Sequence, residues 1–406
     1  MGADLLWPSY SSPQDLAAIE AIPLAERGLP DSTYAVLRRA ADLWPDRTAL
    51  TVLPDALRWQ QPVRRTFGEL LSDVHKTANL LRDLGVTRHS PVALISANCN
   101  ELITATLAAQ LAGIAAPING GLSKEHVTEL VQRSGARVLV AAAPELDETC
   151  WQVARHLVDA GVIDTVLLLR PTADPVADAA PPVDGATVDH MVRRAEKYDG
   201  STFFGAPPAP GDLAALIHTG GTTGTPKLAA HTHANEVACA WSIAAITLLD
   251  EDSVVFAALP LFHVNALMVT LLAPLLRGQQ TLWAGPLGYR DTALYANFWK
   301  IVAHHGISAM SAVPTVYAAL TQCRVDADIS SLRSAIVGAS PLPPSVRKDF
   351  ESHTGIALCE GYGLTEATAA SARSFPDLPR PGSVGQRLPY QRAKRSASTT
   401  AATGTT

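Results

Sequence analysis

Cysteine is scarce in this sequence of 406 residues. Its five cysteines are Cys99, Cys150, Cys239, Cys323 and Cys359. They form no C-x-x-C pair, which argues against a structural zinc site and against a disulfide framework. Scattered thiols of this kind fit a reducing compartment best, so the sequence predicts a cytoplasmic protein.

Long hydrophobic runs and an excess of positive charge are also missing. The longest apolar runs, at 102–117 and 266–276, are too short to span a bilayer, and they contain Gln110 and Pro274 respectively. Residues 1–20 show no basic-then-apolar signal pattern. The formal net charge of −6 shows no excess of positive charge that would bind nucleic acid. We therefore expect no transmembrane segment and no nucleic-acid partner, whereas a homodimer stays open.

The residues that are present follow the pattern of an α/β protein. Hydrophobic residues make up 47 % of the chain and charged residues 17 %, and the length calls for two or three subdomains around one large core. Thr66 and Glu69 form a capping box for a helix that Gly85 ends. Further helices are expected at 101–112, 124–133, 151–160, from 266, at 292–304, at 314–320 and after Pro343. Strands are expected at 92–95, 137–142, 165–169, 213–217, 254–259, 280–283, 307–311, 334–337 and 356–359. This alternation predicts βαβ units and mainly parallel pairing.

A proline-rich stretch divides the chain into two βαβ series. Residues 171–211 contain PTADPVADAAPP and GAPPAPG, and we expect a Pro/Ala-rich connector without chemistry. A first α/β subdomain is expected at 31–170 and a second at 212–390, built on two similar sheet layers sandwiched by helices. Residues 1–30 are expected to form a surface segment, and residues 391–406 a disordered tail.

The stretch LAALIHTGGTTGTPK, residues 213–227, has the composition of a phosphate-binding loop. An apolar run at 213–217 leads into three glycines, four threonines and Lys227. Glycines let backbone N–H groups approach an anion, the hydroxyls add donors, and the lysine adds charge. Apolar residues at helical spacing follow from about Thr232, so we expect the order strand, loop and helix, with a helix N-terminus near the anion.

Two other interpretations of this loop fit less well. A Walker-A loop is disfavoured because two residues separate Gly224 from Lys227, and Leu228 stands where a magnesium-binding hydroxyl is needed. The second alternative is a plain surface turn rich in glycine and threonine. A lysine and a preceding buried strand favour anion binding over such a turn.

Three later stretches follow predicted strands, where α/β sheets place their ligands. PLFHVN at 260–265 contains His263, which is either a satisfied core histidine or a site residue. GASPL at 338–342 has the composition of a tight strand-to-helix turn. EGYGLTE at 360–366 combines an aromatic ring that could cover a base, glycines, a hydroxyl and a carboxylate able to bind Mg²⁺ through oxygen.

Together these four stretches resemble the adenylate-forming superfamily, which contains acyl-CoA synthetases, luciferases and peptide-synthetase adenylation domains. The resemblance covers residues 30 to 390, and the Thr-Gly-Gly form of the loop with His263 is most similar to fatty acyl-CoA synthetases. It implies activation of a carboxylic acid with ATP and Mg²⁺ to acyl-AMP, followed by transfer of the acyl group to coenzyme A.

The resemblance also implies a role for each motif. The loop would grip the β and γ phosphates of ATP, and Tyr362 would stack on adenine. The implied catalytic residues are Thr219, Lys227, His263, Thr365 and Glu366, with Glu366 as the metal ligand. The implied ATP-binding residues are Thr219, Gly220, Gly221, Thr222, Thr223, Gly224, Thr225, Lys227, Gly338, Ala339, Ser340, Glu360, Gly361, Tyr362, Gly363 and Thr365. The implied acid-binding residues are His263, Val264 and Asn265.

The expected acid is fatty or otherwise hydrophobic, because residues 261–276 are apolar and no cation is evidently placed to select a dicarboxylate. An aromatic acid stays open as an alternative.

Near residue 390 the resemblance stops. The family continues with an aspartate for the ribose hydroxyls, an arginine, a hinge and a mobile domain that carries a lysine. We therefore expect a truncated or frameshifted chain with an incomplete β-barrel subdomain. Two functions stay open: an acyl-CoA synthetase, or an impaired fragment that binds nucleotide or an acyl ligand.

Overall fold

The capping box predicted at Thr66 begins a long helix. The Thr66 hydroxyl accepts from the Glu69 N–H at 3.1 Å, and the Glu69 carboxylate accepts from the Thr66 N–H at 2.9 Å. Helix α4, Phe67–Asp83, follows directly. The computed structural model describes residues 5–176, 179–219, 226–376, 378, 380 and 382–393.

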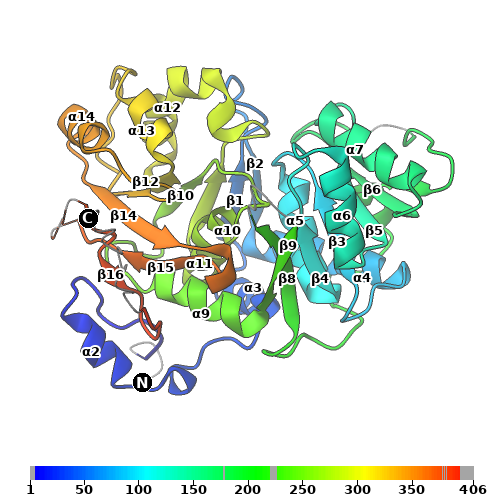
Figure 1. Ribbon diagram of the computed structural model, residues 1–406, viewed down its shortest axis with the longest axis horizontal. Helices are drawn as coiled ribbons and strands as arrows, with labels where there is room; N and C mark the ends of the chain where they lie inside the picture. Colours follow the sequence, from blue (N-terminus) through cyan, green and yellow to red (C-terminus); the bar gives the residue numbers. More distant parts are fainter. Residues whose placement is uncertain are drawn as a thin grey trace, which may run out of the picture.

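Seven strands form the first sheet (Figure 1). Their order is β7-β6-β5-β3-β4-β8-β9, and every pair is parallel except the antiparallel β8–β9. The bounds are β3 Pro91–Ile95, β4 Ile114–Pro117, β5 Val138–Ala142, β6 Thr165–Leu169, β7 Thr187–His190, β8 Leu213–Thr219 and β9 Lys227–Thr232.

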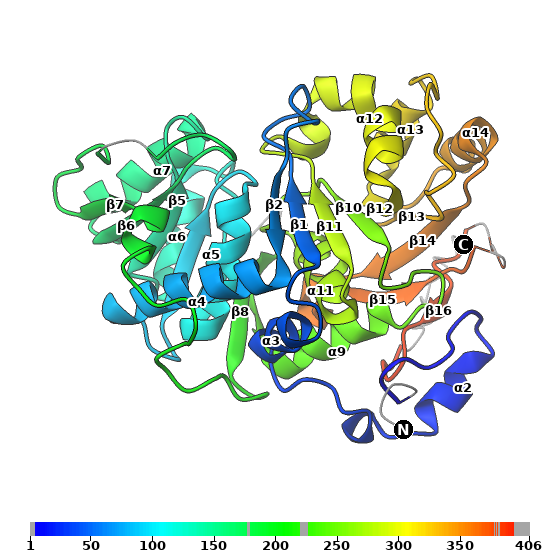
Figure 2. The same cartoon turned by 180° about the vertical axis from the view of Figure 1, so that it is seen from behind.

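Helices cover both faces of this sheet. Figure 1 shows α6 and α7 in front of it, and Figure 2 shows α4 and α5 on the opposite face. Since α5 is apolar almost all round, it is buried along its whole length. The bounds are α5 Asn100–Ala112, α6 Lys124–Ser134, α7 Glu148–Asp159 and α8 Met191–Ala195.

Nine strands form the second sheet, in the order β16-β15-β14-β13-β12-β10-β11-β1-β2. The central run from β14 to β1 is parallel, and both edges are antiparallel. The bounds are β1 Thr48–Val52, β2 Val63–Thr66, β10 Val254–Ala257, β11 Gln280–Trp283, β12 Ile307–Ala312, β13 Ser334–Val337, β14 Leu358–Gly363, β15 Ala370–Arg373 and β16 Gln386–Arg387.

One face of the second sheet packs on helices α12, α13 and α14, around Phe298, Tyr317 and Phe350. The other face shares a larger apolar core with the first sheet, to which α3, α4, α5, α9 and the helical run at 264–277 contribute. The bounds are α2 Asp15–Glu20, η1 Leu24–Glu26, α3 Thr33–Leu43, α9 His233–Ala244, α10 Val264–Leu267, a π-helical turn η2 Met268–Leu272, α11 Ala273–Arg277, η3 Gly288–Arg290, α12 Thr292–His305, α13 Pro314–Leu320, α14 Pro344–Thr354 and η4 Thr365–Ala367. This confirms the predicted fold class, two βαβ-built sheets sandwiched by helices.

The predicted order of strand, loop and helix around 213–232 is wrong. β9 lies between the loop and α9, and it pairs antiparallel with β8 from Leu213↔Thr232 to Thr219↔Lys227. The N-terminus of α9, at His233, therefore lies at the opposite end of this hairpin from the loop. The sequence KLAAHT carries no clear alternation of apolar and polar residues, so its pairing with β8 decides its conformation.

The two sheets do not divide at the predicted connector. β7 and α8 lie within 171–211 and extend the first sheet, so this stretch is not simply a connector. β1 and β2 precede the first sheet in sequence yet belong to the second, whereas β8 and β9 follow the connector and complete the first. The predicted boundaries at 170 and 212 therefore do not separate the sheets.

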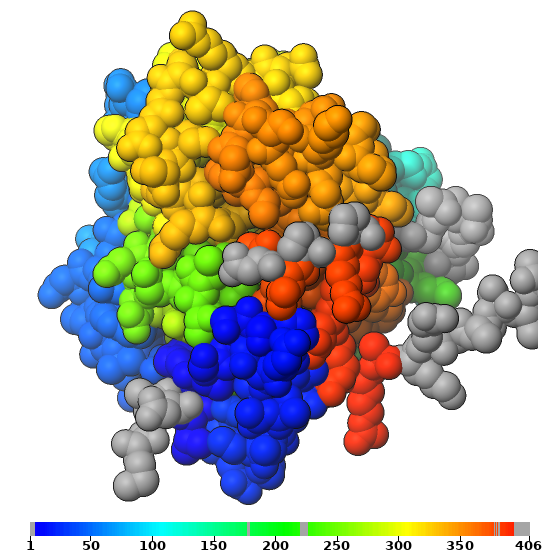
Figure 3. All heavy atoms as spheres, turned by 90° about the vertical axis from the view of Figure 1, so that its left-hand side faces the viewer, coloured from blue at the N-terminus to red at the C-terminus, as the bar shows by residue number. Residues whose placement is uncertain are grey.

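The N-terminal segment lies beside the last described residues (Figure 3). Arg387 of β16 forms an ion pair with Glu20, and the Tyr390 hydroxyl lies within hydrogen-bond distance of the backbone carbonyls of residues 19 and 22. The predicted tail lies outside the described residues beyond residue 393. None of the helices in the described ranges has the length and apolarity that crossing a membrane requires.

Candidate functional site

Three of the four predicted stretches meet at one cavity of about 400 Å³. The turns after β10, β13 and β14 build it, because the carboxyl ends of these parallel strands lie along one edge of the second sheet. Its walls are Leu259, Pro260, Phe262, His263, Val264, Asn265, Val269, Ala312, Val313, Ile336, Gly338, Ala339, Gly361, Tyr362, Gly363, Leu364, Thr365, Ala369 and Ala370.

His263 faces this cavity at the N-terminus of α10. Its Nδ1 accepts from the Asn265 N–H at 3.2 Å, so the neutral ring carries its proton on Nε2. The side chain is exposed to the cavity, and the cavity walls lower its pKa by removing part of its water. His263 is thus a neutral donor at neutral pH and not a satisfied core histidine.

Asn265, two residues further along, brings an unsatisfied acceptor to the same wall. Its Nδ2 donates to the Ser311 hydroxyl at 3.0 Å, which fixes the orientation of the amide. Its Oδ1 is buried and makes no hydrogen bond. A ligand that offers an N–H or O–H at this point would satisfy it.

The end of β14 presents an aromatic ring. Tyr362 is 53 % exposed, and it lies on the cavity wall with Gly338 and Ala339 of the neighbouring turn. Gly363 is required by the chain itself, since a Cβ there would lie 1.7 Å from the Ala369 carbonyl oxygen. The exposed face of Tyr362 is free for stacking.

Buried polar side chains contact Thr365, two residues after Gly363. The Thr365 carbonyl oxygen lies 2.7 Å from Nε2 of His231 in β9, and Nδ1 of His231 lies 3.6 Å from the Glu236 carboxylate. Glu236 in turn accepts from the Gln110 amide at 2.7 Å. His231 and Glu236 are at most 2 % exposed. The hydrogen bond from His231 joins the Thr365 turn to β9, and the one from Gln110 joins α5 to α9.

The hairpin that carries the predicted phosphate loop contacts this turn through His231 of β9. Thr219 and Lys227 are opposite each other in the β8–β9 ladder, and Lys227 is exposed. Gly220, Gly221, Thr222, Thr223, Gly224 and Thr225 lie outside the described residues.

Three other predicted site residues do not line the cavity. The Glu360 carboxylate points to α14, where Arg347 donates to it at 2.7 Å. Ser340 is exposed beyond the Gly338 turn. Glu366 is also exposed, on η4, and faces a separate hollow together with His231.

The sequence offered no clear signal for three residues near the site. His218 on β8 accepts from the Asn119 N–H and lies against Phe262, and burial lowers its pKa. His231 ties the Thr365 turn, as described above. Arg373 lines a second cavity that adjoins the first. Each depends on a strand pairing that periodicity alone does not predict.

Comparison with known proteins connects this geometry to one family. A model of the AMP-binding enzyme family matches residues 37–395. A marinolic acid–CoA ligase from Pseudoalteromonas sp. (strain SANK 73390) is 33 % identical over 93 % of this chain and 57 % of its own length. The long-chain-fatty-acid–CoA ligase FadD13 of Mycobacterium tuberculosis (strain H37Rv) is 26 % identical over 84 % of this chain and 64 % of its own. The chain thus spans less than two thirds of the length of these relatives.

Solved structures share the fold. The anthranilate CoA ligase AuaEII in complex with anthranoyl-AMP superposes with a TM-score of 0.75 at 22 % identity, over 90 % of this chain and 66 % of that one. The inhibitor-bound N-terminal domain of FACL13 from Mycobacterium tuberculosis gives a TM-score of 0.72 at 23 % identity, over 88 % and 82 %.

Proposed function

The chain belongs to the AMP-binding enzyme family, and we propose that it activates a carboxylic acid with ATP and transfers the acyl group to coenzyme A. The observation that carries this proposal is the convergence of the His263, Gly338 and Tyr362 segments on one cavity. Thr365, on the wall of this cavity, contacts His231 of the hairpin that carries Thr219 and Lys227.

In the proposed reaction the substrate carboxylate is itself the nucleophile. One carboxylate oxygen attacks the α-phosphorus of ATP, and the bond from that phosphorus to the bridging oxygen of pyrophosphate breaks. The sulfur of coenzyme A then attacks the acyl carbonyl, its proton is lost, and AMP leaves. The protein needs no nucleophile of its own, so its part is orientation and charge stabilisation.

Each described residue has a task in this proposal. The exposed Tyr362 ring stacks on adenine, and Gly338 and Ala339 form the facing wall. Lys227 and Thr219 hold the end of the phosphate chain, where negative charge accumulates on the departing pyrophosphate. The Nε2–H of His263 donates to the acid, which orients it without taking its proton.

Mg²⁺ fits the exposed carboxylate of Glu366. Within the described residues no group of three or more His, Cys, Asp or Glu side chains could hold a metal by itself. Mg²⁺ is commonly bound by one or two carboxylates plus the phosphates of a nucleotide. Glu366 would therefore hold an ion that arrives with ATP, and the ion would neutralise phosphate charge when bound.

We propose a hydrophobic acid as the substrate, because the His263 cavity continues into apolar walls such as Val264 and Val269. Support also comes from the relatives, whose names include a long-chain fatty acid and marinolic acid. An aromatic acid is the alternative.

The test is acid-dependent release of pyrophosphate from ATP, measured over a panel of fatty, dicarboxylic and aromatic acids, alongside calorimetric binding of ATP. We expect release that needs both acid and Mg²⁺, with AMP formed in equal amount. Binding of ATP without release would instead favour a nucleotide-binding role. Absence of both would contradict the proposal.

A further inference from the structure

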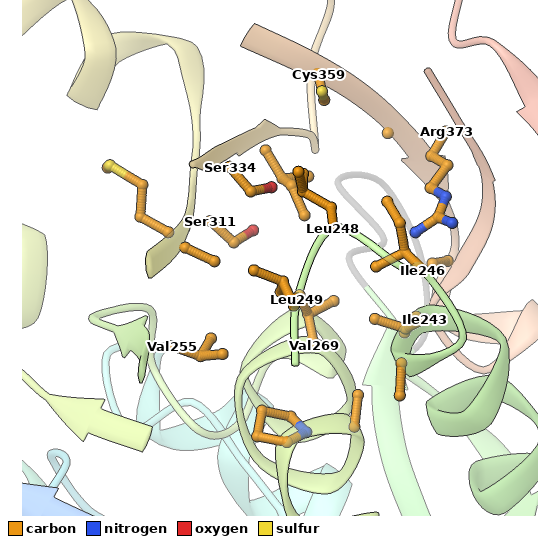
Figure 4. A pocket seen from close by; sticks show the side chains of 18 of the residues that line it. Ile243, Ile246, Leu248, Leu249, Val255, Val269, Ser311, Ser334, Cys359 and Arg373 are labelled. Atoms are coloured by element: carbon orange, nitrogen blue, oxygen red, sulfur yellow. The ribbon is translucent and has the colours of Figure 1, made fainter. Parts of the chain in front are cut away.

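A second, narrower cavity adjoins the first. It has a volume of about 90 Å³ and shares four wall residues with the larger cavity, Val269, Ile336, Gly361 and Ala370. Figure 4 shows that most of its labelled side chains are aliphatic, among them Ile243, Ile246, Leu248 and Leu249. An acid whose carboxylate lies near His263 could extend its chain into this space.

The volume of this second cavity limits the shape of the acid that can enter it. An apolar cavity of roughly 150 Å³ holds a benzene ring, so about 90 Å³ is small for a ring, whereas an unbranched chain can divide its length between this cavity and the larger one that it adjoins. The narrow cavity therefore favours an unbranched methylene chain over an aromatic acid.

Arg373 lies at the side of this cavity, whose walls are mostly but not wholly apolar. It belongs to β15, opposite Gly361 of β14, and Figure 4 shows its side chain extending toward Ile246. The guanidinium carbon lies 4.8 Å from the ring centre of Tyr10 and 5.3 Å from that of Phe375. Its Nε and Nη2 are buried and make no hydrogen bond.

The charge of Arg373 has no counter-charge in the described parts of the chain. No carboxylate there forms an ion pair with it. Tyr10 supplies no negative charge, because burial raises the pKa of its phenol above the usual value although Arg373 opposes this. Burial correspondingly lowers the pKa of Arg373.

Aromatic faces offset only part of the desolvation of such a cation. A desolvated cation–π contact contributes about 2 kcal/mol, whereas removing a charge from water costs several kcal/mol. A guanidinium presents two parallel N–H donors that match a carboxylate. An anion brought by a ligand would complete the site.

We propose that Arg373 recognises the distal carboxylate of an α,ω-dicarboxylic acid, whose methylene chain occupies the narrow cavity while its other carboxylate lies near His263. This inference rests on the proposed function for the identity of the site as an acid pocket. It replaces a plain fatty acid by a linear diacid as the preferred substrate class.

The test measures acid binding and does not depend on turnover. Isothermal titration calorimetry would compare matched pairs at neutral pH: hexanoic with hexanedioic acid, octanoic with octanedioic acid, and decanoic with decanedioic acid. A hydrogen-bonded ion pair corresponds to a 10- to 100-fold difference in Kd, so we expect one diacid to bind at least 10-fold tighter than its monoacid partner.

Arg373→Met keeps the length of the side chain between Tyr10 and Phe375 and removes its charge. We expect it to abolish the preference for the diacid, to leave monoacid binding within about twofold, and not to lower the Tm. Arg373→Lys should retain part of the preference. The control is Arg387→Met on the adjacent strand, where the cation is already paired with Glu20; it should keep the preference.

Three results would overturn the inference: equal or tighter binding of the monoacid, no binding of either acid, or an Arg373→Met variant that loses both acids together with several degrees of Tm. The last would mean that Arg373 only supports the fold. Failure of the proposed function looks different, because ATP binding and pyrophosphate release would be absent while the Arg373-dependent preference persisted.

Discussion

At the scale of single residues, the end of β14 leaves no room for a side chain at residue 363. Gly363 lies where a Cβ would lie 1.7 Å from backbone of residue 369. The backbone must move to admit any side chain, and Tyr362 and Thr365 would move with it.

Replacing this glycine therefore tests how closely the turn is coupled to nucleotide binding. We expect Gly363→Ala to weaken ATP binding at least 10-fold and to lower the free energy of unfolding by about 1–3 kcal/mol, the usual cost of overpacking. The matched control is Gly211→Ala, where a Cβ meets nothing within 4 Å. ATP binding by Gly363→Ala that equals the wild type in calorimetry would refute a role for this turn.

Lys227 offers the most direct test of the phosphate-binding hairpin. Because the side chain is exposed at the end of β9, its removal should not disturb the fold. We expect Lys227→Ala to raise the Kd for ATP about 10- to 100-fold, as for loss of a charged hydrogen bond, with less effect on AMP. Lys300→Ala, which removes a surface lysine paired with Asp326, serves as the control. Equal losses for ATP and AMP would contradict a contact to the terminal phosphates.

At the scale of secondary-structure elements, a buried histidine connects helices α9 and α3. His233, the first residue of α9, is fully buried, and its Nδ1 accepts from the N–H of Thr33, the first residue of α3. Burial lowers the pKa of His233 to about 4. The imidazole is therefore neutral in the folded protein at neutral pH.

This lowered pKa predicts a loss of stability in mild acid. The folded protein binds this proton only near pH 4, whereas the unfolded chain binds it near pH 6.5, so stability falls as the pH drops between these values. At a pH below both pKa values, this shift lowers the free energy of unfolding by about 3 kcal/mol. Urea unfolding at pH 7, 6 and 5 should show a shallower pH dependence for His233→Gln than for the wild type. His353→Gln, at an exposed position on α14, should not change the slope, and an unchanged slope in His233→Gln would exclude this account.

Sequence patterns predicted the elements whose signal is local. The capping box at Thr66, the strand at 165–169 and the helix at 314–320 are confirmed, because caps, apolar runs and prolines act within a few residues. β7 and β9 were missed, since their sequences TVDH and KLAAHT become strands only through pairing with a neighbour.

For the site, too, sequence patterns predicted the residues of local motifs and not the residues that strand pairing brings in. His263 and Tyr362 follow strands and belong to recognisable motifs, so their meeting at one cavity could be expected. Arg373 and His231 could not, because the antiparallel pairings of β15 and β9 bring them to the site.

At the scale of the whole molecule, the N-terminal segment is fastened to the far edge of the second sheet. The Tyr390 hydroxyl accepts from Arg27, and its single hydrogen can be donated to the carbonyl of Ile19 at 2.9 Å or to that of Ile22 at 2.6 Å. Arg27 also lies over the Trp241 ring. One hydroxyl thus joins the first thirty residues to the end of the described chain.

Removing that hydroxyl should loosen the segment without unfolding the protein. We expect Tyr390→Phe to cost about 1–3 kcal/mol, because buried partners are left without hydrogen bonds, and to speed proteolysis within residues 5–29. Tyr198→Phe, which breaks only a hydrogen bond to exposed Asp83, is the control. Limited proteolysis followed by mass spectrometry would locate the cuts, and an unchanged pattern would argue against this fastening.

The exchange of strands between the two sheets has a consequence for synthesis on the ribosome. The β1–β2 hairpin emerges early, but Leu50 must wait for Thr281 of β11 before its parallel pairing can form. Until then the hairpin exposes an unpaired edge, which invites association with other nascent chains. Because β8 and β9 likewise complete the first sheet, neither sheet can fold before strands from the other part of the sequence are present. We therefore expect slow folding governed by long-range contacts.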